Sequence, residues 1–427
     1  MKKQFVQILL ILCPIIAYTQ KQDTLTKQQS DTLVSKVFQL GEVTITSIQG
    51  RLLIDRITHE TMEEQNRFEV SKVANLMPGV HLTSSGPRNE SMITIRGFDL
   101  RAVPVFMDGI PVYVPYDGYV DLSRFTTFDL SAIDISKGFT SVLHGPNIMG
   151  GALNLISRKP SHKIEADGSI GMINTNGFRG NVNIGANFKR AYIQAGYSYL
   201  HRAAFALSEN FQPHKHEDGG NRENSYRTDQ KVNLKIGWTP NEKHEYVLGF
   251  IYQQGSKGSP VYAGDDTLNS LINKPRYWQW PNWDKTTFFF LSNTKINEKN
   301  YIKTRIYYDI FKNTIESYDD STYTTMNKPY AFKSKYNDYT YGAGIEYGTT
   351  MIPKNELKFS AQYKQDVHRE NNVGDPVQHF TDHTFHIAIE DVYNITKFMS
   401  IIPGISYSGR QNTRVPMIHY LILTTLV

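Results

Sequence analysis

From residue 161 to residue 410, the chain repeats short segments in which apolar and polar side chains alternate with a period of two. In KVNLKIGW, which begins at Lys231, valine, leucine, isoleucine and tryptophan fall on one side and most polar residues on the other. A period of two places successive side chains on opposite faces of a strand. The sequence therefore predicts strands near residues 164–172, 177–188, 190–200, 226–238, 243–254, 283–296, 299–311, 335–349, 355–368, 381–393 and 396–410.

The connections between these predicted strands alternate in length. Those after the second, fourth, sixth, eighth and tenth strands are short, whereas long loops span 201–225, 255–282, 312–334 and 369–380. Up-and-down barrels of outer membranes have tight turns on one side of the membrane and longer loops on the other. A soluble β-sandwich gives no reason to gather every long loop at one end. We therefore expect a mainly β fold, whose larger part is an antiparallel up-and-down transmembrane β-barrel.

Residues 48–160 show a different residue pattern, in which short β-rich runs are separated by glycine. An Asp-Gly pair at 108–109 is a strong hairpin signal, because both central residues of a tight primed turn need positive φ. Residues 61–77 predict a single helix, with a capping box at Thr61 and Glu64 and a Pro-Gly stop after it. These features predict a small α+β domain ahead of the barrel.

The run IRG…VPVFMDGIPV…DISKG…LHGPNIMGGALNLISRKP, within residues 92–160, resembles the plug domain of TonB-dependent outer-membrane receptors of the siderophore-receptor type. The resemblance covers residues 41–160 by motif and 161–410 by architecture. Its signature positions are Arg96, Gly97, Asp108, Gly109, Lys137, Gly138, Gly145, Gly150 and Gly151. We expect the glycines to form tight turns and close backbone approaches. Arg96 is expected to pair with a charge across the interface between plug and barrel.

The N-terminal residues carry signals for export and coupling. Lys2 and Lys3, followed by an apolar run, predict a secretory signal peptide over residues 1–19. Residues 20–47 form a polar leader that contains a segment resembling the TonB box of the family. This segment consists of Glu42, Val43, Thr44, Ile45 and Thr46. A periplasmic partner would bind it by strand addition; the alternatives are an ordinary first strand of the plug and a box at Asp31–Ser35.

The number of predicted strands is small for the plug that they would enclose. A plug of about 120 residues is roughly 35 Å wide. A barrel of 12 strands has a diameter of roughly 26 Å, and one of 22 strands roughly 47 Å. We therefore expect about 11 of roughly 22 strands at 161–410, followed by an aberrant hydrophobic tail at 411–427. On this expectation the chain is C-terminally truncated and inactive alone; a twelfth strand in the tail is the alternative.

Composition and motifs argue against several classes of function. A net charge of +5 without a dense basic cluster does not indicate nucleic-acid binding. The sequence lacks the motifs of phosphate-binding loops and of nucleophilic or paired-carboxylate active sites. His214, His216, Glu217 and Asp218 lie on one predicted loop, where alternate residues rarely converge on a metal. We therefore expect no enzyme activity, catalytic residue, cofactor or metal site.

All four tryptophans lie in the predicted barrel region. Trp238, beside a short turn, suits the aromatic girdle at a membrane interface. Trp278, Trp280 and Trp283 cluster where a long loop enters a strand. These three predict either the girdle at the opposite interface or contacts to a ligand such as an aryl-bearing siderophore.

The resemblance implies import without covalent chemistry. It places the protein in the cell outer membrane of a Gram-negative bacterium, with outer-membrane lipid and TonB, together with ExbB and ExbD, as partners. No nucleic acid is expected to bind. The solute expected from the family is a ferric siderophore; cobalamin, haem or another metal chelate are alternatives. A surface or adhesive barrel that transports nothing is the alternative of another class.

Overall fold

The computed structural model describes residues 54–85, 88–138, 140–264, 268–269, 274–396, 399–412 and 415–426, with side chains up to residue 412. The expected signal peptide, the leader and the segment Glu42–Thr46 lie outside the described residues. Within that part of the chain, no helix is long and apolar enough to cross a membrane.

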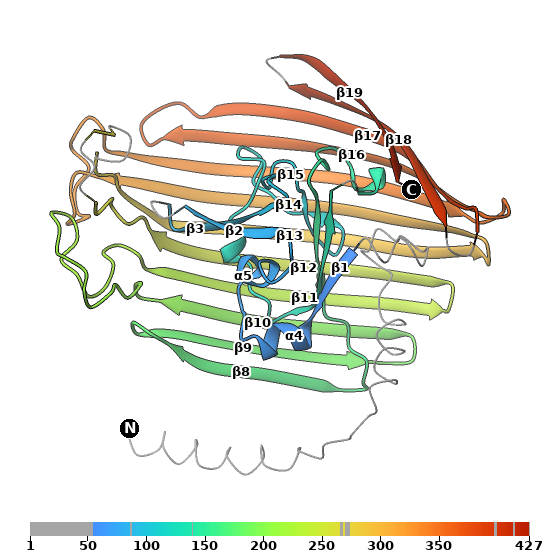
Figure 1. The fold of residues 1–427 in the computed structure, drawn as a ribbon, viewed down its shortest axis with the longest axis horizontal. Helices are drawn as coiled ribbons and strands as arrows, with labels where there is room; N and C mark the ends of the chain where they lie inside the picture. The colour runs from blue at the N-terminus through green and yellow to red at the C-terminus, as the bar shows by residue number, and fades with distance from the viewer. Residues whose placement is uncertain are drawn as a thin grey trace, which may run out of the picture. The chain divides into compact units, whose positions relative to one another are not determined.

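Residues 54–157 form a small α+β domain, the plug. Its elements are β1 (Ile54–Thr58), α4 (His59–Glu64), α5 (Val70–Ala74), β2 (Val80–Ser85), β3 (Glu90–Ile95), β4 (Val105–Met107), β5 (Ile110–Pro111), η2 (Leu122–Arg124), β6 (Leu130–Lys137), η3 (Val142–His144) and β7 (Gly151–Ser157). Five strands make one sheet in the order β1-β6-β7-β4-β5, and β2 and β3 form a separate hairpin (Figure 1). Ile133, Leu153 and Leu155 of the central strands are fully buried in its core.

The predicted single helix over 61–77 is wrong, because the structure has two short helices, α4 and α5. The N-cap of α4 is Thr58, whose hydroxyl accepts a hydrogen bond from the backbone N–H of Thr61 at 3.4 Å, so Thr61 is not the cap. Asn66 follows α4 with φ of 49°, in the left-handed region, and breaks the helical path. The break lets Val70 start α5 in the core, where its N–H donates to the carbonyl of Phe125.

The predicted hairpin at 108–109 is confirmed. Asp108 and Gly109 have φ values of 51° and 78°, as a primed turn requires, and they join β4 to β5. The turn also fixes the Asp108 carboxylate, which accepts a hydrogen bond from the Ser157 N–H at 2.9 Å.

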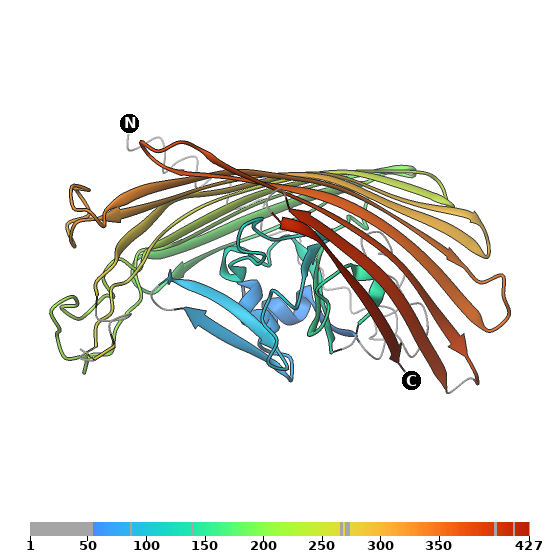
Figure 2. The same cartoon turned by 90° about the horizontal axis from the view of Figure 1, so that it is seen from above.

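The rest of the described chain is one antiparallel sheet of twelve strands in sequence order. The strands are β8 (Glu165–Ile173), β9 (Gly177–Asn187), β10 (Ala191–Arg202), β11 (Arg227–Asn241), β12 (His244–Gly258), β13 (Tyr277–Asn297), β14 (Asn300–Tyr318), β15 (Phe332–Thr349), β16 (Asn355–Asn372), β17 (Gln378–Asn394), β18 (Ser400–Asn412) and β19 (Val415–Leu426). The sheet is curved, and the plug lies against its concave face (Figure 2). The predicted fold class is confirmed.

The first eleven strands match the predicted ones, with the largest differences at the long loops. β13 begins at residue 277 rather than near 283, and β14 ends at residue 318 rather than near 311. Backbone pairing continues there beyond the alternating segment, because a ladder needs paired N–H and C=O groups and not a side-chain pattern. Sequence periodicity therefore locates each strand's centre better than its loop end.

Residues 411–427, expected to form a hydrophobic tail, instead contain the alternative twelfth strand. β19 pairs antiparallel with β18, from Ile402 opposite Leu426 to Asn412 opposite Val415. The segment lacks the regular alternation on which the prediction relied, but its backbone satisfies the edge of β18 all the same.

The sheet reverses the usual placement of polar and apolar residues. Along β11, every second side chain faces the plug and is buried, and this inward set is polar: Arg227, Asp229, Lys231, Asn233 and Lys235. On the outward face, Val232, Ile236 and Trp238 are exposed. A soluble sheet buries its apolar face, whereas a lipid-embedded barrel exposes it. The convex face of this sheet is therefore suited to lipid.

We predict that Gly151→Ala lowers the free energy of unfolding of the plug by about 2–4 kcal/mol. Gly151 has φ of +132°, and a Cβ there would overlap the carbonyl oxygen of Ser136 on the paired strand β6. The measurement is urea unfolding followed by tryptophan fluorescence. Gly97→Ala is the matched control: Gly97 also has positive φ, +89°, but nothing lies within 4 Å of the added carbon. The control should lose only about 1 kcal/mol, and equal losses would contradict the prediction.

Candidate functional site

The concave face of the sheet carries a row of buried cations where it meets the plug. Arg227, Lys231 and Lys235 follow one another on β11 at intervals of four residues, and Lys257 on β12 is the pairing partner of Arg227. Each is at most 3% exposed. An unpaired buried cation would be costly, so each must meet a counter-charge.

The plug supplies most of these counter-charges from its turns, and Asp229 of β11 itself lies 2.5 Å from Arg227. The Nζ of Lys235 lies 3.6 Å from the Asp108 carboxylate and donates a hydrogen bond to the Ser157 hydroxyl at 2.6 Å. The Nζ of Lys231 lies 2.8 Å from the carboxylate of Asp129. The Asn233 amide donates a further hydrogen bond to that carboxylate at 2.7 Å.

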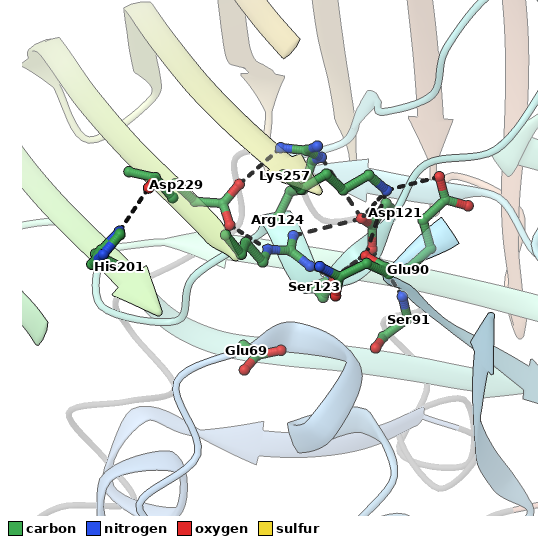
Figure 3. A network of polar contacts seen from close by, with 12 residues as sticks. Glu69, Glu90, Ser91, Asp121, Ser123, Arg124, His201, Asp229 and Lys257 are labelled. Atoms are coloured by element: carbon green, nitrogen blue, oxygen red, sulfur yellow. Dashed lines mark hydrogen bonds and ion pairs between the residues drawn. The ribbon is translucent and has the colours of Figure 1, made fainter. Parts of the chain in front are cut away.

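A denser group of charges lies near the long-loop end of β11 and β12 (Figure 3). The Asp121 carboxylate lies 3.5 Å from both Arg227 and Lys257 and 3.7 Å from Arg124. Lys257 also contacts Glu90 of β3 at 2.9 Å. Arg124, the cation that the plug contributes, reaches across to Asp229 of β11 at 3.0 Å. Cations and carboxylates thus alternate across the interface.

Local turn chemistry positions the carboxylate of Asp121. Asp121 is the N-cap of η2, and its Oδ1 accepts hydrogen bonds from the backbone N–H of Ser123 at 3.1 Å and of Ser91 at 3.0 Å. Its other oxygen, Oδ2, faces the three cations. Burial alone would raise the pKa of Asp121, but Arg227, Lys257 and Arg124 hold it below its ordinary value.

The pKa of Asp129, the partner of Lys231, results from the same two opposing effects. Burial would raise the pKa of its carboxyl group, and the ammonium of Lys231 with its hydrogen bond lowers it below the ordinary value. Both plug carboxylates are therefore ionised at neutral pH. The contact between plug and sheet is held by charge as well as by apolar packing.

A second part of the plug contacts strands that lie nearer to β19 in the order of the sheet. The backbone of η3 meets β16 and β17: the N–H of Val142 donates to Glu390 at 3.1 Å, and the Gln362 amide donates to the carbonyl of Leu143 at 2.7 Å. Arg305 of β14 donates to the carbonyl of Gly109 at 3.1 Å. Burial lowers the pKa of His144 in this region to about 3, so its ring is neutral.

Trp280 and Trp283 face the plug. They are three residues apart, and a regular strand would place them on opposite faces, but a bulge between Gln279 and Asn282 shifts the register. Trp280 stacks on the Lys257 ammonium at 4.8 Å, and Trp283 packs on the Arg124 guanidinium at 5.0 Å. Both are buried, so the girdle interpretation is wrong for them. Their contact with a ligand stays a prediction.

The other two tryptophans lie apart from this interface. Trp278 is partly buried and donates from its indole to the hydroxyl of Ser317 at 3.0 Å. Trp238 is exposed beside the short turn and stacks on Tyr246, as a girdle residue would. Contact of Trp278 with a ligand also stays a prediction.

The signature residues of the plug act mainly within the plug. Gly138, Gly145 and Gly151 have positive φ, and a side chain at Gly150 would meet Phe98. Lys137 forms an ion pair with Asp55 of β1. Asp108 alone of these positions reaches a sheet cation among the described ion pairs.

The predicted role of Arg96 is wrong. Arg96 is exposed and has φ of 51°, and its guanidinium lies against Gly138 of the plug itself. The positive φ follows from the tight turn between Ile95 and Phe98, which directs the side chain back over the plug. Among the residues described, the interface pairing expected for Arg96 is made by other side chains.

The acidic residues of the long loop at 203–226 come together without the histidines. Carboxylate oxygens of Glu217, Asp218 and Glu223 lie within 4.8 Å of one another. Glu217 is buried and already paired with Arg222 at 2.5 Å. The ring of His214 lies 6.3 Å from that of His216, at a tilt of 53°. The loop therefore gathers three carboxylates, one of which pairs with an arginine.

Sequence reasoning missed the buried cations of β11 and β12 and the carboxylates at positions 121 and 129. One signal could have found the cations: basic residues recur every fourth position on the polar face of RTDQKVNLK, which begins at Arg227. That interval puts them on one side of a strand. Nothing local identifies their partners, which lie more than a hundred residues away.

Comparisons with known proteins agree with this geometry. Residues 52–152 match the family model of the TonB-dependent Receptor Plug Domain. Transferrin-binding protein A from Haemophilus influenzae is 22% identical over 429 residues, which cover 87% of this chain and 44% of that protein. The structures of the copper transporter OprC and the FrpB iron transporter from Neisseria meningitidis share its fold with TM-scores of 0.70, at 12% and 14% identity.

These two structural matches cover 87% of this chain and 60% and 62% of the other chains, respectively. This chain therefore spans less than two thirds of the length of the relatives described.

We predict that Arg124→Met lowers the free energy of unfolding of the docked plug by about 3–5 kcal/mol, because it leaves the buried carboxylates of Asp121 and Asp229 short of a cation. Denaturant unfolding followed by the fluorescence of Trp283, which packs on Arg124, measures the loss. Arg410→Met is the control: Arg410 pairs with Asp382 at 2.7 Å, but its side chain is 57% exposed. The control should lose less than about 1 kcal/mol.

We also predict a specific pH dependence for plug docking. The pKa of Asp121 is lower in the folded than in the unfolded protein, so its contribution is complete above the ordinary value of 3.8 and is lost as pH falls through the lower, folded value. Unfolding midpoints measured between neutral and acid pH should fall only in the acid range. Asp121→Asn should be less stable at neutral pH and should show a shallower acid slope; equal slopes would contradict this assignment.

Proposed function

We propose that this chain, which belongs to the TonB-dependent receptors, is the plug and the first part of the barrel of an energy-coupled importer in the outer membrane of a Gram-negative bacterium. One observation carries the proposal: a plug with a sheet of its own is docked by buried ion pairs on the polar concave face of a sheet whose convex face is apolar. A docked plug closes a pore, and an apolar outer face suits lipid.

Import requires the plug to move, and the topology indicates where a pull would act. β1 is the edge strand of the plug sheet and pairs with β6. Among the described residues it is the first strand, and it follows the leader, in which Glu42–Thr46 resemble a TonB box. TonB, driven by ExbB and ExbD, would bind this box by strand addition. The pull would load the β1–β6 ladder first and then the ion pairs to the wall.

We propose a ferric siderophore as the solute. The named iron transporter and transferrin-binding protein among the relatives support iron, and the named copper transporter keeps other metal chelates, cobalamin and haem as alternatives. Import of any of these needs no covalent step. It needs a binding surface outside, a route past the plug and a supply of mechanical energy.

Deletion of residues 42–46 should abolish uptake and leave ligand binding intact. The test uses the complete receptor that carries this chain, in an iron-limited strain without other receptors. Radioactive ferric tris-catecholate, ferric tris-hydroxamate, haem and cobalamin are offered in turn. Binding without uptake is expected in the variant, because the plug stays docked when nothing pulls on it.

Deletion of residues 26–30 is the matched control, since it shortens the same polar leader by the same length. This control should import normally. Uptake that survives loss of residues 42–46 would refute energy coupling through that segment. Uptake restricted to cobalamin would refute the iron assignment and keep the importer.

A further inference from the structure

We propose that the inward faces of β11 and β12 form the route of the solute through the barrel, and that this solute is an anion whose charge replaces that of the plug carboxylates as the plug moves. We call this surface the β11–β12 wall: the inward side chains from Arg227 to Lys235 and from Gly249 to Lys257. The inference rests on the proposed function and adds the charge class and the path of the solute.

The cations of this wall form a series along the direction of transport. Arg227, beside Lys257, lies at the long-loop end of β11, Lys231 follows, and Lys235 lies toward the short-turn end. With a rise of about 3.4 Å per residue, successive cations stand about 14 Å apart and the series spans about 27 Å. The hydrocarbon core of a bilayer is about 30 Å thick. Because the strands of such barrels tilt by about 35–45°, the series extends over roughly two thirds of that thickness.

The signs of the charges are segregated between wall and plug. The wall contributes four cations and the single carboxylate of Asp229. The plug groups that pair with it are the carboxylates of Glu90, Asp108, Asp121 and Asp129 and the single cation of Arg124. Docking alone would work equally well with the signs mixed on each surface. Segregation leaves a positive wall whenever the plug moves away.

A positive wall inside a low-dielectric barrel attracts anions and repels cations. Charge of one sign in a cleft with apolar surroundings concentrates its field and raises the local concentration of counter-ions. Anion-selective pores use rings of lysine and arginine in this way. Several separated cations also let an anion leave each site for the next, which one deep site would not allow.

The wall retains a donor that the plug does not use fully. Within the described part of the chain, Nη2 of Arg227 is buried and makes no hydrogen bond, although it lies 3.5 Å from the Asp121 carboxylate. The plug thus occupies the charged sites of the wall without using every hydrogen-bond donor there.

The test exchanges the charges of one pair: Asp129→Lys together with Lys231→Asp. This pair suits the exchange because the two groups face each other at 2.8 Å, so the swapped side chains can still pair and dock the plug. The pair is kept, while the signs of charge that wall and plug present at this position are exchanged. Uptake is measured in the complete receptor with an anionic ferric tris-catecholate and with a ferric tris-hydroxamate that carries a free ammonium group, each normalised to surface binding.

The unaltered receptor should import the anionic chelate in preference to the cationic one. The swap should lower uptake of the anion by about tenfold, because the wall charge at this one position changes by two units at contact distance in water. The midpoint of plug unfolding, followed by tryptophan fluorescence, should stay unchanged. As a control, Glu316→Lys with Lys333→Glu exchanges a pair between β14 and β15 and should leave normalised uptake unchanged.

A second variant covers a failure of the swap to fold: Asp129→Asn with Lys231→Gln keeps polar groups in place, removes both charges and should lower anion uptake about threefold. Unchanged anion uptake in a well-docked variant would overturn the proposed route. Preference for the cationic chelate would overturn the charge class and leave the importer standing. No energy-coupled uptake of any offered solute by the unaltered receptor would overturn the proposed function, and this inference with it.

Discussion

The structure depends on the cost of placing a charge out of water. The sheet carries its cations on the concave side, and each of them is buried because the plug is there. Such burial is tolerable only when a carboxylate stands opposite, so the turns of the plug must present Asp108, Asp121 and Asp129 at the levels of Lys235, Arg227 and Lys231. Plug and wall are therefore one electrostatic unit although their strands belong to separate sheets.

Two kinds of attachment divide the plug surface. Toward β11 and β12, side chain meets side chain as ion pairs, which weaken when water enters. Toward β14, β16 and β17, sheet side chains such as Gln362 and Arg305 bind backbone carbonyls of the plug. Hydrogen bonds to the backbone persist only while the turns keep their shape. The charged side is thus suited to release by hydration, and the other side by local unfolding.

Features with a local cause could be predicted from the sequence. The period of two gave the strand centres, and the φ requirement of the Asp-Gly pair located the hairpin. The break after α4 was missed because Asn66 leaves the helical region where the apolar spacing continues toward Val70. The inward placement of both Trp280 and Trp283 depends on a bulge that pairing with the neighbouring strands reveals. The ion pairs join residues distant in sequence, so the cation pattern was visible and the partners were not.

The alternation of polar and apolar side chains along β11 also fixes the register in which this strand can pair in a membrane. A slip of one residue against a neighbouring strand would turn Lys231 and Lys235 toward the hydrocarbon and Ile236 toward the lumen. Each lysine near the middle of a bilayer costs about 2–4 kcal/mol. A sheet in the wrong register would therefore be unstable in lipid whether or not the plug is docked. The membrane therefore favours the correct strand register, because only that register keeps the charges that hold the plug out of the lipid.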